Sequence, residues 1–456
     1  MNSRYFGTRS FYKEAILIAI PVMFTQLIQS LVNLIDNFMV AGLGDVKMSG
    51  VNTAGALIFA FQVLINAICI SGGMFLTQHF GAKNTKGMQQ AICFKIITTS
   101  IPVVIYITAC LLFPKQIISV LLIGNSEANL IIAEGTKYMR IMSLIGIPMT
   151  ISYIIASSLR EIGKVNPPLV ITVIATLINT FFNYVLIYGH LGLPRLEVTG
   201  AAIATVIARI SEMLMFIIYI SIRKQPFAIE FNNLMNIDWH VFKEILVKAS
   251  MVIFSELIWV ISETVTTAIY NGRGGADVVS GMASSFTIAN LFFVSFNGIT
   301  TATGVIIGKT LGEGKLDEAR QKKTWLSVAS IIFGFIMVGV ALLNALLVPV
   351  FFGKLSISAQ NICKGMIVGL AMLMPLWVYQ NTQFAISRAG GDSKMGFLVD
   401  GIFTIGLYFP LIFALGLLTS IGPVELYVIA KLVDVPKVIF AEWWLKKERW
   451  VKNLAQ

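Results

Sequence analysis

The stretch KEAILIAIPVMFTQLIQSLVNLIDNFMVAGLG, residues 13–44, returns in altered form as KEILVKASMVIFSELIWVISETVTTAIYNGRG, residues 243–274. Identical residues stand 230 positions apart, as at Lys13 and Lys243, Phe24 and Phe254, and Gly42 and Gly272. With one extra residue in the second copy, the correspondence runs on to Gln90 and Gln321. Both copies are strongly apolar. This internal repeat predicts a chain made of two similar halves.

The composition is that of a membrane protein. Hydrophobic residues make up 56% of the 456 residues and charged residues 12%, whereas soluble domains carry about 25% charge. Apolar runs of about 20 residues, long enough to cross the hydrocarbon as helices, recur along the whole chain. We therefore predict an all-α membrane protein with about twelve transmembrane helices, over residues 15–40, 52–80, 92–113, 136–158, 168–189, 198–222, 245–270, 282–308, 325–352, 362–387, 396–417 and 422–445.

Charge and cysteine usage exclude several classes of partner. The net charge is +11, but Lys and Arg stand between the apolar runs and form no basic domain, so no nucleic-acid partner is expected. The four cysteines form no CxxC pair and stand in or beside predicted spans, so we expect small core residues rather than a disulfide framework or a metal centre. They are Cys69, Cys93, Cys110 and Cys363.

The segments between the spans alternate between rich and poor in Lys and Arg. The poor set holds only Lys47, Lys115, Arg195, Arg273 and Lys354. The positive-inside rule places the rich set, and with it both termini, in the cytoplasm. Each half then crosses the membrane six times and starts on the same side, so the two halves form a parallel repeat.

This arrangement predicts the domain organisation. We expect an amino-terminal six-helix lobe over residues 1–222, a cytoplasmic linker over 223–243 and a carboxy-terminal six-helix lobe over 244–456, around a central cavity. Parallel repeats are typical of secondary transporters, whose halves rock around a shared site. Because one chain holds both lobes, we expect a multi-pass protein of the cytoplasmic membrane that functions as a monomer.

A polar stripe runs along the first predicted span. Gln26, Gln29, Asn33 and Asp36 follow one another at spacings that place them on one helical face. A carboxylate near mid-membrane costs roughly 2.5–3.5 kcal/mol, so it normally faces a protein interior or a water-filled cavity. Asp36 is therefore a candidate functional residue. The other three either line a cavity or join helices by hydrogen bonds.

The repeat places a second stripe in the seventh span, where Glu256, Glu263 and Thr266 share a face and Thr266 stands in the position of Asp36. Asn179 and Asn183 lie one turn apart in the fifth span. Four other groups are in the sixth, eleventh and twelfth spans: Thr205; Arg209 with Glu212; Asp400; and Lys431, Asp434 and Lys437. We expect Arg209 and Glu212 to pair with each other, and the last three to form a structural charge ladder.

The sequence shows no catalytic constellation. His79, His190 and His240 stand apart, and no HExxH, GxSxG or GxxxxGK[ST] motif is present. We therefore expect neither an enzyme nor a bound cofactor. Since the chain has no ATP-hydrolysing module, the driving force is an ion gradient or the membrane potential, worth about 2.3 kcal/mol per charge per 100 mV.

The chain resembles the multidrug and toxic compound extrusion (MATE) transporters. The resemblance covers nearly the whole chain and is carried by an ordered set of segments: AIPVMFTQL and NLIDNFMVAGLG within 19–44, QHFGAKN at 78–84, SSLREIGKVNPP at 157–168, NTFFNYVLIYGHLGLP at 179–194, TGAAIAT at 199–205 and SRAGGDSKM at 387–395. It implies two six-helix lobes around a V-shaped cavity. It also implies export of cationic or amphipathic organic compounds, drugs among them, in exchange for Na⁺ or H⁺.

The resemblance further implies an ion-coupling site in the amino lobe, at Asp36, Asn179, Asn183 and Thr205. Members with a second carboxylate in helix five have Asp where this chain has Asn183, so one formal charge remains here. That leaves Na⁺ or H⁺ as the coupling ion, with Na⁺ at Asp36 as the single metal ion expected.

The carboxy lobe departs from the family pattern. Glu256 matches a helix-seven carboxylate of some members, which also carry an acidic residue in helix ten, but residues 379–383 are neutral here. Glu263 or Asp400 would then have to take its place. With the first stripe, these residues give the expected substrate cavity: Gln26, Gln29, Asn33, Glu256, Glu263 and Asp400.

Three alternatives remain open at this point. A flippase for lipid-linked precursors would have a related fold and a more cationic cavity. A major-facilitator transporter is also built from six plus six helices, but its usual Asp-Arg loop is replaced by residues 81–84, Gly-Ala-Lys-Asn. A membrane enzyme would need a nucleophile or metal cluster. The expected partners are small organic cations or drugs and the lipid bilayer.

Overall fold

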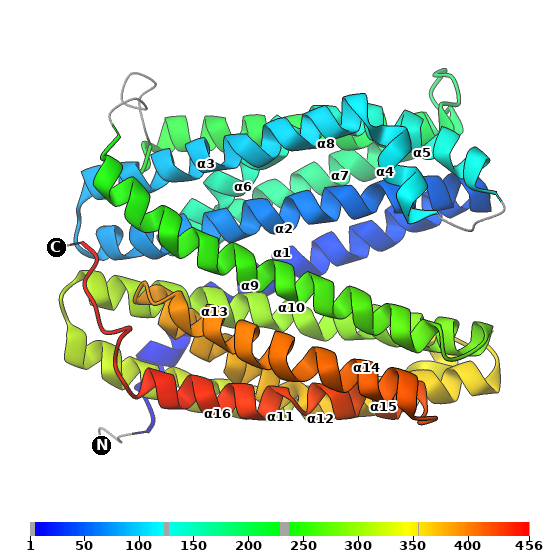
Figure 1. Cartoon of the computed structure of the whole chain (residues 1–456). Helices are drawn as coiled ribbons and strands as arrows, with labels where there is room; N and C mark the ends of the chain where they lie inside the picture. Colours follow the sequence, from blue (N-terminus) through cyan, green and yellow to red (C-terminus); the bar gives the residue numbers. More distant parts are fainter. Residues whose placement is uncertain (1–4, 123–126, 229–236, 354, 456) are drawn as a thin grey trace. The chain divides into compact units, whose positions relative to one another are not determined.

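The computed structural model describes residues 5–122, 127–228, 237–353 and 355–455, and all regular structure in these ranges is helical (Figure 1). Within these ranges, eleven helical segments are long and apolar enough to cross a membrane. Nine are continuous helices: α1 (Arg9–Ala41), α2 (Asp45–Gly81), α3 (Thr85–Leu112), α7 (Asn166–Tyr188), α8 (Glu197–Arg223), α9 (Trp239–Asn271), α10 (Ala276–Gly312), α11 (Leu316–Phe351) and α12 (Ile357–Ala389).

Two further spans are interrupted. The fourth consists of α5 (Ala128–Met142), the 3₁₀-turn η1 (Ser143–Ile145) and α6 (Gly146–Glu161). The eleventh consists of α13 (Lys394–Val399), the π-helix η3 (Asp400–Tyr408) and α14 (Phe409–Leu418). Each lies where a single span was predicted. The short helix α4 (Pro114–Leu121) was not predicted and begins at a proline, the residue that suits a first helical position.

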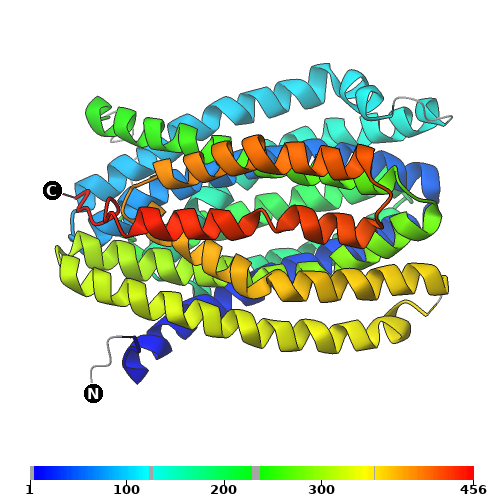
Figure 2. The same ribbon diagram turned by 60° about the horizontal axis from the view of Figure 1, so that its bottom comes forward.

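The predicted twelfth span is two helices in line, α15 (Pro423–Lys431) and α16 (Asp434–Leu445) (Figures 1 and 2). The chain tightens between them, because the N–H groups of Leu432 and Val433 donate three residues back, to Ile429 and Ala430. Pro436 has no N–H for the carbonyl of Leu432, which explains why the helix does not run through this point. The break follows directly after Lys431.

The chain divides into two compact units. One contains residues 24–76 and 85–245, and the other contains residues 1–23, 77–84 and 246–456. In the first, α8 packs against α5, α6 and α7, and α3 packs against α6. In the second, α12 packs against α10, α11, α15 and α16, and these helices run side by side in Figures 1 and 2.

Residues 77–84 belong to the second unit through specific contacts. Gln78 Nε2 donates to the carbonyl of Ala389 at 2.6 Å, and Gln78 Oε1 accepts from the N–H of Leu454 at 2.6 Å. A Cβ added at Gly81 would collide with the carbonyl of Lys309, and one at Gly312 would collide with the carbonyl of Gln78. The glycines that the repeat aligns, Gly81 and Gly312, thus let the ends of α2 and α10 approach closely.

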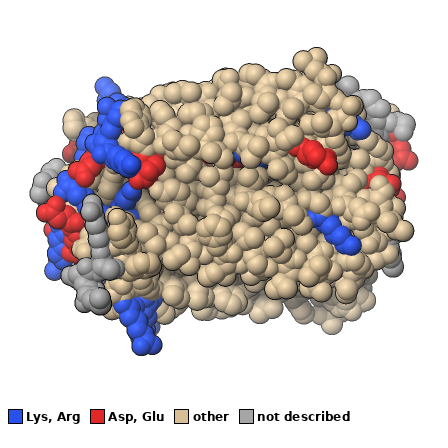
Figure 3. Space-filling model, turned by 90° about the horizontal axis from the view of Figure 1, so that it is seen from below, with Lys and Arg blue, Asp and Glu red and all other residues tan. Residues whose placement is uncertain are grey.

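The surface fits a lipid environment. On the face drawn in Figure 3, Lys and Arg side chains gather toward one end, and the wide surface beside them is almost free of charge. On α11, Phe335, Leu343, Leu346 and Val350 are each more than 60% exposed. Such a continuous apolar surface is unfavourable in water and suits contact with lipid.

Candidate functional site

The four residues of the expected coupling site meet within the first unit. Asp36 comes from α1, Asn179 and Asn183 from α7, and Thr205 from α8. Asn183 Nδ2 donates to Asp36 Oδ1 at 2.7 Å and to Asn179 Oδ1 at 3.2 Å. Asn179 Nδ2 lies 3.5 Å from Thr205 Oγ1, to which it donates. The spacing of four residues places Asn179 and Asn183 on one face of α7, and packing of α7 against α8 brings Thr205 beside them.

Either one or both of the asparagine amides can donate hydrogen bonds to the carboxylate of Asp36. Turning the Asn179 amide by half a rotation places its nitrogen 2.9 Å from Asp36 Oδ2. Both asparagines then donate to Asp36, and hydrogen bonds of this kind to an ionised acceptor are stronger than those between neutral groups. The cluster can therefore stabilise an ionised carboxylate with amide N–H groups alone.

One oxygen of the cluster is left over. Asn183 is 2% exposed, and its Oδ1 atom has no hydrogen-bond partner among the described residues. A buried acceptor without a partner costs about 1–3 kcal/mol. Together with the carboxylate, the Asn179 amide and the Thr205 hydroxyl, it gives an all-oxygen donor set, which suits a hard cation such as Na⁺. No group of three His, Cys, Asp or Glu side chains that could hold a transition metal occurs in the described part of the chain.

Next to this cluster lies an ion pair. Arg209 Nη1 donates to Glu212 Oε2 at 2.7 Å, as predicted, and Thr172 Oγ1 donates to Glu212 at 3.3 Å. Arg209 is one turn beyond Thr205 on α8, and its positive charge acts on Asp36. The Asp36 cluster therefore has a guanidinium in its neighbourhood, held in place by Glu212.

The remaining residues of the first stripe precede Asp36 along α1. Asn33 is exposed, and Gln26 and Gln29 are half-buried. All three belong to the same unit as Asp36.

In the second unit two of the three predicted acidic residues have basic partners. Arg388 Nη2 donates to Glu256 Oε1 at 3.1 Å, and Lys431 Nζ donates to Glu263 Oε1. Asp400 is 9% exposed and begins the π-helix η3, a form often found at functional sites. The hydroxyl of Ser255 lies beside it.

The charge ladder predicted on the twelfth span forms only in part. Lys437 pairs with Asp434 at 3.1 Å, and Trp377 Nε1 donates to Asp434 at 2.8 Å. Lys431 instead reaches across to Glu263 on α9. A spacing of three residues on one helix was a poor guide here, because a buried lysine bonds the carboxylate that its side chain can reach.

Two charged residues with hydrogen-bond partners on other helices were missed by the sequence analysis, one fully buried and one half-buried. Lys95 on α3 is fully buried and donates to Glu161, Ser157 and Ser158 at 2.6, 3.1 and 3.1 Å. Glu442 on α16 accepts from Tyr379 at 2.6 Å and from Lys323 at 2.9 Å. Lys95 stands within the apolar run of residues 92–113, and a lysine in such a run is itself a signal.

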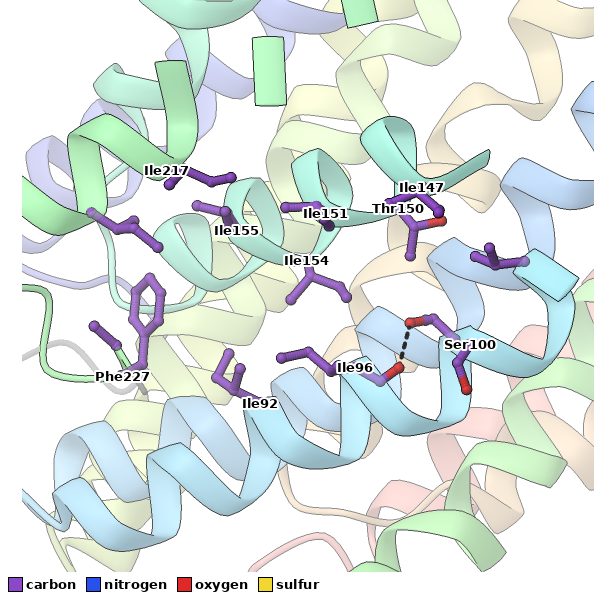
Figure 4. A pocket seen from close by; sticks show the side chains of 14 residues that line it. Ile92, Ile96, Ser100, Ile147, Thr150, Ile151, Ile154, Ile155, Ile217 and Phe227 are labelled. Carbon is purple, nitrogen blue, oxygen red and sulfur yellow. Dashed lines mark hydrogen bonds between the residues drawn. The ribbon is translucent and has the colours of Figure 1, made fainter. Parts of the chain in front are cut away.

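The first unit also holds an apolar cavity of about 510 Å³ between α3, α6 and α8 (Figure 4). Isoleucines line most of it, including Ile92, Ile151 and Ile155, and none of the predicted site residues is among its lining residues. The four cysteines are buried and free, which confirms their interpretation as core residues.

Comparison with known proteins decides the family. The model of the MatE family matches residues 21–185 and again residues 252–414. The chain belongs to the MatE family. The two matches fall in the two halves of the repeat, so each half is a MatE unit. This assignment excludes the major-facilitator alternative.

Individual MatE relatives are distant in sequence. The chain is similar to a probable multidrug resistance protein NorM of Thermotoga maritima, with 23% identity over 66% of this chain and 64% of the relative. It is also similar to a probable multidrug resistance protein NorM of Agrobacterium fabrum, with 24% identity over 76% of this chain and 72% of the relative. The solved structure "Crystal structure of MATE in the bent conformation" matches with a TM-score of 0.85 and 17% identity, over 96% of this chain and 95% of that one.

These matches confirm the predicted fold class: an all-α, multi-pass membrane protein with the twelve-helix, two-lobe fold of the MatE transporters. The chain is thus a member of a family of membrane transporters.

Proposed function

We propose that the protein is a secondary antiporter that exports cationic or amphipathic organic compounds, drugs among them, across the cytoplasmic membrane in exchange for Na⁺ or H⁺. The observation that carries this proposal is the cluster of Asp36, Asn183, Asn179 and Thr205 around a single carboxylate. The names of the two relatives support multidrug compounds as the exported class.

The ion step follows from the chemistry of the cluster. In the structure, the Asn183 amide donates a hydrogen bond to Asp36 at 2.7 Å. A sodium ion would replace these N–H groups and draw on the carboxylate, the unpaired Oδ1 of Asn183, the Asn179 amide oxygen and the Thr205 hydroxyl. A proton would bind Asp36 directly and needs no further oxygen. We favour Na⁺, because the second acidic position of the family is an amide here and Asn183 Oδ1 has no other described partner.

The driving force depends on the charge of the exported compound. Exchange of one Na⁺ for one monovalent organic cation moves no net charge, so only the concentration gradient of Na⁺ contributes, about 1.4 kcal/mol per tenfold ratio. Exchange of Na⁺ for a neutral compound moves one positive charge inward, so the membrane potential adds about 2.3 kcal/mol per 100 mV to the driving force. One carboxylate without a second acidic partner fits a single exchanged cation.

The deciding experiment uses purified protein in liposomes loaded with a fluorescent organic cation. The Na⁺ and H⁺ gradients are collapsed separately, and the wild type is compared with Asp36→Asn. We expect loss of gradient-driven transport in Asp36→Asn with substrate binding retained. Asp45→Asn, the same change at an exposed residue at the start of α2, is the matched control. Normal transport by Asp36→Asn against a gradient would contradict the proposal.

A lipid-precursor flippase is the second candidate. It is favoured by the finding that Glu256 and Glu263 are paired with Arg388 and Lys431, because two of the three acidic residues expected in the cavity are then neutralised. Movement of a lipid-linked precursor by the same liposomes, independent of any ion gradient, would support this candidate instead.

We also propose that both termini are cytoplasmic and that the monomer is the functional unit. The distribution of Lys and Arg between the spans supports the first, and the presence of both lobes in one chain supports the second.

A further inference from the structure

The internal repeat extends to the helices of the ion site. TVIARISE at 205–212 aligns with YVIAKLVD at 427–434, and NYVLIY at 183–188 aligns with YFPLIF at 408–413. The second unit therefore holds a counterpart for each residue of the cluster: Thr266 for Asp36, Thr404 for Asn179, Tyr408 for Asn183, Tyr427 for Thr205, Lys431 for Arg209 and Asp434 for Glu212.

The counterparts repeat the central hydrogen bond of the first cluster without its charge. Thr266 Oγ1 and Tyr408 Oη share a hydrogen bond of 2.5 Å, as Asp36 and Asn183 do at 2.7 Å. Thr266, Thr404, Tyr408 and Tyr427 are all at most 3% exposed. The carboxylate of this second cluster comes instead from Glu263, one turn before Thr266 on α9.

The positive charge of the second cluster is the ammonium group of Lys431. Lys431 is 8% exposed, and its ammonium donates to Glu263. Lys431 Nζ lies 5.0 Å from the centre of the Tyr408 ring and 5.3 Å from that of Tyr427, within the range of cation–π attraction. Asp434 does not compete for Lys431, because it is held by Lys437 and Trp377.

The matching pair in the first unit behaves differently. Arg209 pairs with Glu212 on its own helix, at 2.7 Å. Asp36 therefore has no ion pair to a fixed cation among the described residues, whereas Glu263 has one.

We propose that Lys431 is a built-in cation that fills the second unit's counterpart of the ion site, so that removing its ammonium opens a latent Na⁺ site at Glu263, Thr266 and Tyr408. An ammonium and a sodium ion carry the same charge, and the carboxylate and two hydroxyls are oxygen ligands that Na⁺ accepts. The second lobe would then hold its cation permanently, and only the first would exchange one. The inference rests on the proposed function only in taking Asp36 as the exchanging site.

The test measures binding of radioactive Na⁺ to the purified full-length protein, in a background that lacks the first site. Asp36→Asn alone should bind no Na⁺ at millimolar concentration. Adding Lys431→Ala should raise the stoichiometry from zero to one Na⁺ per chain. Adding Glu263→Gln as well should return it to zero, and Lys431→Arg in place of Lys431→Ala should leave it at zero.

Folding of the variants is followed by thermal unfolding in NaCl and in choline chloride. Lys431→Ala should be stabilised by Na⁺ and not by choline, and Lys431→Met with Glu263→Gln should respond to neither. The proposal is overturned if Asp36→Asn with Lys431→Ala folds and binds no Na⁺. It is equally overturned if Lys431→Ala aggregates in NaCl while the neutral double variant folds, because Na⁺ would then fail to replace the ammonium. If the Asp36→Asn variant with Lys431 unchanged transports normally against a gradient, the proposed function is refuted, and the Na⁺-binding result for Lys431 is unaffected.

Discussion

Asn183 Nδ2 donates to Asp36 Oδ1 across 2.7 Å, and this hydrogen bond ties α7 to α1 at the point where α1 carries its carboxylate. The other polar atom of the same amide, Oδ1, is buried without a described partner. The two ends of this side chain thus differ in their contacts. In the proposed Na⁺ site the nitrogen is the donor to Asp36, and the oxygen would be a ligand of the ion.

The Asn183 side chain should separate sodium from proton coupling. Asn183→Ala removes a ligand, so a Na⁺-coupled protein should lose at least tenfold in apparent Na⁺ affinity, equal to about 1.4 kcal/mol. A proton-coupled protein should keep most of its activity. The measurement is the Na⁺ dependence of efflux in liposomes, with Asn344→Ala, at a half-buried asparagine of α11, as control.

Arg209 and Glu212 should shift ion affinity in opposite directions. Removal of the guanidinium in Arg209→Gln takes away a positive charge near Asp36, so the affinity for a cation should rise by about tenfold, the scale of 1.4 kcal/mol. Glu212→Gln releases Arg209 from its 2.7 Å pair and should lower the affinity. Titration of ion binding by both variants checks this. Shifts of the same sign in both would show that the pair acts only on folding.

Lys95 should be required for stability. Lys95→Met leaves Glu161 without its partner in the interior, which typically costs 3–5 kcal/mol. Lys95→Met combined with Glu161→Gln should recover much of that loss, because no unpaired charge remains. Thermal unfolding in detergent is the measurement. Lys137→Met, which breaks an exposed pair with Glu134, should change stability by at most about 1 kcal/mol.

Glu256 should affect cationic and neutral substrates unequally. Glu256→Gln leaves Arg388 without its 3.1 Å partner and adds a net positive charge in this unit. Export of cations should therefore weaken more than export of neutral compounds of similar size. Glu263→Gln should act in the same direction, because it leaves Lys431 unpaired. Equal loss for both classes, measured as efflux rates, would indicate a role in folding or coupling.

Topology can be tested with single cysteines, since the four native cysteines are buried. A cysteine at Asn84 should be protected from an impermeant thiol reagent added outside, and one at Leu193 should react. Cysteines at Ser126 and Lys354, two positions outside the described residues, should react as well. The reverse pattern would place the termini outside the cell.

The sequence was sufficient for the positions of the spans, because these depend on local composition. That Asp36, Asn179, Asn183 and Thr205 form one site was implied by the resemblance to MATE transporters, since three different helices contribute them. Asp36 stood out as a carboxylate in an apolar run, and Asn179 with Asn183 as one turn of polar residues. The partner of Glu263 could not be found this way. Lys431 is 168 residues further along the chain, and only packing of α15 against the neighbouring helices places it there.

The sequence also did not predict where the helices are interrupted. Residues 396–417 and 422–445 have the composition of unbroken spans, yet the first contains the π-helix η3 and the second breaks after Lys431. Hydrophobicity predicts the length of a span, but not whether its backbone hydrogen bonds follow the α-helical pattern throughout. Proline at position 436 was visible, but its effect depended on its place at the start of α16.

The contacts of Gln78 have a consequence for how the chain could be divided. A polypeptide cut between residues 228 and 237 would yield two fragments, each with six spans. The first fragment would still carry residues 1–23 and 77–84, which belong to the compact unit of the second. The hydrogen bonds of Gln78 to Ala389 and Leu454 would then join the two fragments. Two separately expressed fragments should therefore find each other in the membrane and restore transport by complementation, and Gln78→Ala should weaken that reassembly more than it weakens the uncut chain.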